Sequence, residues 1–137
     1  MSAPVSHRHP ERGSTLVESA MVGVVFLLLL VAIVEFGRIG YAYNSVSFAA
    51  HRAARYAALR GSGSGHPASA ADIEANAQAC LAAFDNTRLT VTTTWTPDNH
   101  PGSTVQVRVS YGFRTVLLPI SPDLLTLQTT CRQIVLQ

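Results

Sequence analysis

The sequence predicts an α+β fold, in which a long N-terminal transmembrane helix extends into a small domain with a second short helix and a three-stranded antiparallel sheet. Three observations lead to this prediction. An apolar run occupies residues 15–34, no proline occurs between Ser14 and Pro67, and the pattern changes at Leu89 to an alternation of apolar and polar residues. The first two favour one continuous helix, and the third is typical of half-buried strands.

The apolar run from Thr15 to Val34 predicts a membrane span. Its twenty residues carry a single charge, Glu18, and about 20 apolar residues cross a bilayer as a helix. Arg8 and Arg12 precede the run, and this bias favours a cytoplasmic N-terminus and an exported remainder.

We expect the helix to continue past the membrane to about residue 60. A helix over residues 14–60, with its transmembrane half at 14–36, would be about 70 Å long at 1.5 Å per residue. Its second half carries alanines at four-residue spacing, in the rows Ala49, Ala53, Ala57 and Ala50, Ala54, Ala58. Such rows form a candidate packing face, because small residues let another helix or a sheet approach closely. The high helix propensity of alanine explains them equally well.

A linker and a second helix follow. The stretch GSGSGHP ends the first helix and makes residues 61–69 a flexible linker to an exported domain at 70–137. Ser69 and Asp72 resemble a capping box, which predicts a helix that begins there and ends near Phe84. One face of this helix would hold Ile73, Ala77, Cys80, Leu81 and Phe84.

Three strands complete the predicted domain. The apolar residues of the first alternate from Leu89 to Trp95, and those of the second from Val105 to Phe113. The turn-forming segment TPDNHPGS lies between them, so the two strands should pair as an antiparallel hairpin. A third strand is predicted from Leu127 to Val135, and the prolines before it favour an edge position.

Cys80 and Cys131 lie in the part of the chain that would be exported, fifty-one positions apart. This spacing matches no zinc motif, and no histidine or cysteine nearby in the sequence completes a ligand set. We therefore expect a structural disulfide, which would add about 4 kcal/mol to the stability of the domain by closing a long loop. Two unpaired buried thiols are the alternative.

The charges argue against a nucleic-acid-binding protein. Ten arginines, no lysine and eight acidic residues nearly balance one another. No broad basic surface is therefore expected for a phosphate backbone.

Catalytic and cofactor motifs are also missing from the sequence. It has no GxSxG, no HExxH and no glycine-rich phosphate loop with a lysine. His51, His66 and His100 are each expected at the surface, and His7 and His9 lack further metal ligands. The sequence therefore predicts no enzyme, no cofactor and no metal site.

Glu18 is the residue whose position fits a membrane span least well. A charged side chain costs about 3 kcal/mol at the middle of a membrane helix and less near its edge, and such residues are usually paired or functional. Cleavage between Gly13 and Ser14 would leave a new ammonium group four residues before Glu18. The ammonium of one subunit could then neutralise the carboxylate of a neighbour and register the two subunits. A glutamate that reaches the headgroups or Arg12 is the alternative.

The segment around Gly13 resembles the class III signal of type IV pilin-like proteins, in which a peptidase cuts on the cytoplasmic side and leaves the apolar segment in the mature chain. Over residues 12–60, the stretches RGSTLVESAMV, IVEFGRIGYAYN and AARYAA resemble a TadE-like minor pilin or pseudopilin of Tad (Flp) pilus systems. That family commonly has an aromatic residue where this chain has Ser19. The resemblance implies that residues 1–13 are a cytoplasmic leader, cleaved after Gly13.

The resemblance also implies a non-enzymatic role in assembling a pilus. The subunit would be single-pass in the cytoplasmic membrane, with its C-terminal domain exported and available for incorporation into an extracellular pilus. The implied partners are a sister pseudopilin, the major pilin, a prepilin peptidase and the inner-membrane assembly platform.

Two other interpretations fit the same N-terminus. The chain could be a secreted binding domain or small enzyme whose ordinary signal peptide is cleaved near Ala49 or Ala50, or an uncleaved single-span accessory protein. The three interpretations predict mature chains that start at Ser14, near residue 50, and at Met1 or Ser2.

Overall fold

The computed structural model describes residues 11–115 and 125–136, with the backbone alone for Glu11 and Arg12. Its elements are helix α1 (Glu11–Leu59), helix α2 (Ala70–Cys80), a short 3-10 helix η1 (Asn86–Arg88), and strands β1 (Leu89–Thr96), β2 (Thr104–Phe113) and β3 (Leu125–Ile134). The predicted α+β fold class, with two helices and a three-stranded antiparallel sheet, is confirmed.

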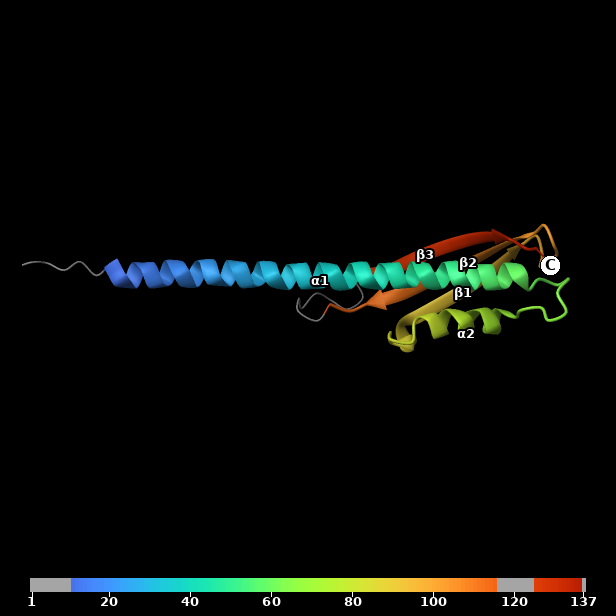
Figure 1. Ribbon diagram of the computed structural model, residues 1–137, viewed down its shortest axis with the longest axis horizontal. Helices are drawn as coiled ribbons and strands as arrows, with labels where there is room; N and C mark the ends of the chain where they lie inside the picture. The colour runs from blue at the N-terminus through green and yellow to red at the C-terminus, as the bar shows by residue number, and fades with distance from the viewer. Residues whose placement is uncertain (1–10, 116–124, 137) are drawn as a thin grey trace, which may run out of the picture.

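Helix α1 is one continuous rod of 49 residues. Its N-terminal half projects away from the sheet and α2, whereas its C-terminal half packs against α2, β2 and β3 (Figure 1). The helix begins at Glu11, so residues 1–10 of the predicted leader lie outside the described residues. It ends at Leu59, just before the glycine-rich linker, because Gly61 and Gly63 favour turns over helix.

The sheet has the strand order β1-β2-β3 with both neighbours antiparallel. Leu89 of β1 pairs with Tyr111 of β2, and Val107 of β2 pairs with Cys131 of β3. Gly102 lies in the β1–β2 turn with a φ of 91°, a left-handed conformation that suits glycine. This order confirms both the predicted hairpin of the first two strands and the predicted edge position of the third.

Helix α2 starts with the capping box that the sequence predicts. The Ser69 hydroxyl accepts the amide of Asp72, whose carboxylate accepts the amide of Ser69 in return. The helix ends at Cys80 and not near Phe84, because the amides of Leu81 and Phe84 each bond a carbonyl three residues back and form tight turns. These turns bring the Phe84 ring into contact with the rings of Tyr41 and Tyr111.

The core lies where α1, α2 and the inner face of the sheet meet. Its largest fully buried side chains are Val46, Ile73, Leu81, Val105, Val107, Val109 and Val135. Alternation along β2 puts every second residue, from Val105 to Phe113, into this core. The core therefore fixes the C-terminal half of α1 to the sheet and leaves the N-terminal half without contacts to it.

Candidate functional site

The N-terminal half of α1 exposes apolar side chains on every side. Leu16, Met21 and Phe26 are 72%, 72% and 59% exposed. By length and composition α1 can cross a membrane, and its apolar window makes no buried contact with the rest of the described structure. Such a helix needs lipid or other helices around it, because isolated apolar surface of this extent is unfavourable in water.

Gly13, Ser14 and Glu18 lie in the first turns of α1, and all three are exposed. Ser14 and Glu18 are four residues apart and therefore share one face of the helix. Glu18 adjoins an exposed apolar surface formed by Met21, Val22, Val25, Phe26 and Leu29. A Cβ added at Gly13 would meet nothing within 4 Å, so no other described side chain packs against this position of α1.

Glu35 is a buried carboxylate at the other end of the apolar run. It is 3% exposed, and its Oε2 lies 2.8 Å from Nη1 of Arg38. The Arg38 guanidinium also lies over the ring of Phe113, 5.4 Å from its centroid. Sequence analysis did not select Glu35 as a site residue, although its spacing of three residues from Arg38 indicates an ion pair on one helix face.

The two alanine rows are buried. Ala49, Ala53 and Ala57, like Ala50, Ala54 and Ala58, are at most 4% exposed. They belong to the part of α1 that packs against α2, β2 and β3. Two polar contacts lie along the same α1–β3 seam: the Ser47 and Thr129 hydroxyls are 3.1 Å apart, and Nδ1 of His51 lies 3.1 Å from Sγ of Cys131.

The expected disulfide between Cys80 and Cys131 is not formed in the structure, where both thiols are free. Helix α2 contacts α1 and β1, whereas Cys131 lies on β3 at the opposite edge of the sheet. Two strand spacings separate these edges by about 10 Å, and a disulfide requires Cα atoms within about 7 Å. Cys131 does face a helix, but the residue that meets it there is His51 of α1.

Ser62, His100 and Asp98 form a small polar cluster between the linker and the β1–β2 turn. The Ser62 hydroxyl lies 2.9 Å from His100 Nδ1, and the Ser62 amide donates to the carbonyl of Asn99. The Asp98 carboxylate is 4.0 Å from His100 Nε2 and instead accepts the Ser103 hydroxyl at 2.7 Å. The cluster holds the linker against the turn and lacks the ordered histidine that a nucleophilic serine needs.

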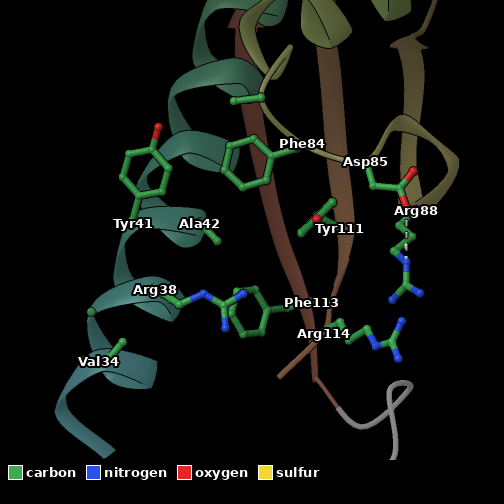
Figure 2. A pocket seen from close by; sticks show the side chains of 12 residues that line it. Val34, Arg38, Tyr41, Ala42, Phe84, Asp85, Arg88, Tyr111, Phe113 and Arg114 are labelled. Carbon is green, nitrogen blue, oxygen red and sulfur yellow. Dashed lines mark ion pairs between the residues drawn. The ribbon is translucent and has the colours of Figure 1, made fainter. Parts of the chain in front are cut away.

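An open pocket of about 610 Å³ lies where α1 leaves the apolar run. It is bounded by α1, by the turn that follows α2, by η1 and by the end of β2 (Figure 2). We call it the arginine pocket. Its lining residues are Val34, Gly37, Arg38, Tyr41, Ala42, Ala83, Phe84, Asp85, Arg88, Tyr111, Phe113 and Arg114.

Aromatic rings form the wall of the arginine pocket. Phe84 stacks on Tyr41 with centroids 5.9 Å apart and meets Tyr111 edge-on at 5.2 Å. These contacts join α1, the turn after α2 and β2, because each ring comes from a different element. Sequence analysis missed this pocket, although Phe84, Tyr111 and Phe113 were each placed on inward faces.

Asp85 is the carboxylate on the rim of the arginine pocket. The hydroxyl and amide of Thr87 donate to it and, with the nearby charge of Arg88, hold the pKa of Asp85 below its usual value. Its Oδ2 lies 3.5 Å from Nε of Arg88. Within residues 11–115 and 125–136, no three His, Cys, Asp or Glu residues come together to hold a metal ion; His7 and His9 lie outside that part.

Comparison with known proteins identifies the long helix. Residues 13–55 match the family model of the TadE-like protein, which confirms the predicted resemblance and is consistent with a TadE-like pilin of Tad systems. The match covers most of α1 and includes Gly13, Ser14, Glu18 and the Glu35–Arg38 pair. No curated protein and no solved structure matches the chain.

Proposed function

We propose that this chain, whose residues 13–55 are TadE-like, is a non-enzymatic minor pilin or pseudopilin that assembles with other subunits of a Tad (Flp) pilus. One observation carries the proposal. The family match falls on α1, the helix whose apolar half has no cover within the described structure. A helix of this kind, joined to a small sheet domain, is suited to a subunit that waits in a membrane and later packs against its neighbours.

The membrane would hold the subunit before assembly. The apolar run is long enough to cross the hydrocarbon core, and Arg8 and Arg12 favour retention of the N-terminus on the cytoplasmic side. The domain formed by α2, the sheet and the second half of α1 would then stand in the exported compartment. In the pilus, the apolar side chains that face lipid would instead face the helices of other subunits.

Glu18 would guide the transfer of α1 from lipid to contacts with the helices of other subunits. After cleavage by a prepilin peptidase between Gly13 and Ser14, the new ammonium and the Glu18 carboxylate would both lie at the membrane edge of one helix face. Pairing the ammonium of one subunit with the carboxylate of the next would remove the cost of an unpaired charge in an apolar setting. Assembly would thus be the event that satisfies both charges.

The buried alanine rows restrict where the neighbours can bind. Since Ala49, Ala53 and Ala57 pack within the chain itself, they stabilise the subunit and leave the N-terminal half of α1 as the main contact for other helices. By resemblance to the family, these helices belong to a sister pseudopilin and the major pilin, and the inner-membrane assembly platform would receive the subunit.

The first test is the mass of the mature N-terminus, measured on chain purified from wild-type membranes. Our proposal expects a chain that starts at Ser14. A start near residue 50 would indicate a secreted domain, and a start at Met1 or Ser2 would indicate an uncleaved single-span protein; either result contradicts the proposal.

The second test is Glu18→Gln, which removes the charge and keeps the shape of the side chain. We expect fewer pili and weaker co-purification of the sister subunits, while the amount of chain in the membrane stays unchanged. Glu74→Gln is the matched control, because Glu74 is an exposed acid on α2 that bonds only Gln78 among the described residues. Pili and co-purification at wild-type levels in Glu18→Gln would exclude the assembly role of Glu18.

A further inference from the structure

The arginine pocket lies at the level where α1 passes from the apolar run into water. About 20 helical residues span the hydrocarbon core, and the headgroup layer beyond it is about 5–7 Å thick, or some four residues of helix. The run ends at Val34, and Arg38 follows one turn later. Both line the pocket, so the pocket opens into the headgroup layer if α1 crosses the membrane as proposed above.

The pocket brings three guanidinium groups to this level. Arg38 comes from α1, Arg88 from η1 and Arg114 from the residue after β2. In Figure 2 the ends of all three side chains lie between the levels of Ala42 and Val34 along α1, and the side chain of Arg88 is directed toward Arg114.

The strand register explains why Arg88 and Arg114 come together. Leu89 pairs with Tyr111, so the preceding residue, Arg88, lies opposite Gly112, where a Cβ would be 3.8 Å from that of Arg88. Arg114 is two residues farther along and forms the diagonal neighbour of Arg88. Like charges in this arrangement repel one another, and an anion between them would remove the repulsion.

The local carboxylates do not neutralise the group. Glu35 pairs with Arg38 at 2.8 Å, and Asp85 lies 3.5 Å from Arg88. In the described part of the chain Arg114 has no ion pair. Among the residues that the structure describes, two carboxylates thus face three guanidiniums, and these groups together give the pocket a net positive charge.

The shape of the pocket suits a molecule with a phosphate and an apolar part. Guanidinium groups bind phosphate oxygens through two parallel hydrogen bonds. The rings of Tyr41, Phe84 and Phe113 supply an apolar wall beside them, and aromatic side chains favour the boundary between lipid and water. We propose that the arginine pocket binds the phosphodiester headgroup of an anionic phospholipid in the outer leaflet of the membrane that α1 crosses.

The test measures lipid bound to the full chain. The protein is reconstituted in bilayer discs with equal amounts of phosphatidylglycerol and phosphatidylcholine, transferred to a mild detergent, and analysed by mass spectrometry for the lipid retained per chain. We expect phosphatidylglycerol to be enriched over phosphatidylcholine. The double variant Arg88→Gln/Arg114→Gln should retain at least about fivefold less phosphatidylglycerol, since one cation at an anionic surface contributes about that factor.

Arg52→Gln/Arg55→Gln is the matched control. It removes the same charge from exposed positions on α1, more than two turns beyond the pocket, and should retain lipid as the wild type does. Unchanged fluorescence of Trp95, the single tryptophan, would show that each variant is folded. Equal loss in both double variants, or no loss in either, would overturn the proposal.

Inorganic phosphate separates a lipid site from a simple phosphate site. A large excess of phosphate should leave the retained phosphatidylglycerol unchanged, and displacement by phosphate would overturn the assignment to lipid. The lipid proposal rests on the proposed membrane position of α1, but its readout needs neither cleavage nor pili. If the chain binds no anionic lipid but starts at Ser14 and supports pili, the lipid-binding proposal is refuted and the proposed pilin function stands.

Discussion

Replacing Ala53 by leucine should destabilise the domain that the second half of α1 forms with α2 and the sheet, even though leucine is nearly as good a helix former as alanine. Ala53 is fully buried where α1 packs against the sheet and α2. The substitution therefore separates the two explanations of the alanine rows. Under helix propensity alone it would change the free energy of unfolding by only about 0.2 kcal/mol.

Close packing leads to a larger effect. Three added carbon atoms must push α1 away from its neighbours or adopt strained rotamers, which costs about 1–3 kcal/mol. For a domain of about 60–100 residues, each kcal/mol lowers the melting temperature by about 4–8 °C. We therefore expect Ala53→Leu to lower the melting temperature by about 5–20 °C.

The assay follows Trp95 fluorescence during heating of the full chain in detergent. Trp95 is a suitable reporter because it is the single tryptophan and packs against the core. Arg55→Leu is the control, since it places the same side chain at an exposed position two residues away. If the two variants melt within about 2 °C of each other, which corresponds to less than about 0.5 kcal/mol, the packing role of the alanine rows is refuted.

Acid should weaken the domain, because hydrogen bonds from Ser69 hold the pKa of Asp72 below its usual value of 3.8. This contribution is complete above about pH 5 and is lost as the pH falls through the folded pKa. The urea midpoint of the wild type should therefore fall at low pH, and the midpoint of Asp72→Asn should fall by less. Gly102→Ala should cost about 1–3 kcal/mol in urea unfolding, because its φ of 91° is left-handed. A maleimide reagent without reductant should label two thiols per unfolded chain; labelling of neither Cys80 nor Cys131 would contradict the free cysteines.

Much of the fold follows from periodicity along the sequence. The apolar run and the absence of proline between Ser14 and Pro67 predict α1, and alternation from Leu89 to Phe113 predicts the hairpin with the observed inward faces. The end of α2 was predicted too late. A pattern of inward residues continues to Phe84 whether the backbone remains helical or forms successive tight turns, so periodicity cannot place that boundary.

The relation between the two cysteines shows what periodicity leaves open. Inward directions for Cys80 and Cys131 follow from the local pattern, and both residues do lie on or beside core-facing positions. Their separation depends instead on which edge of the sheet α2 covers. Packing of α2 along β1 places them at opposite edges, and no local pattern contains that choice.

By itself the sequence determined the long apolar helix, the position of Gly13 and Glu18 at its start, and the alternation that builds the sheet. These features depend on the order of residues within one element, so local sterics and hydrophobicity are sufficient to predict them. The tertiary structure alone decided that the alanine rows are buried and that Cys131 meets His51. It also decided that Arg38, Arg88 and Arg114 share one pocket. Each of these results depends on side chains from elements far apart in the sequence, whose meeting is set by the packing of the whole core.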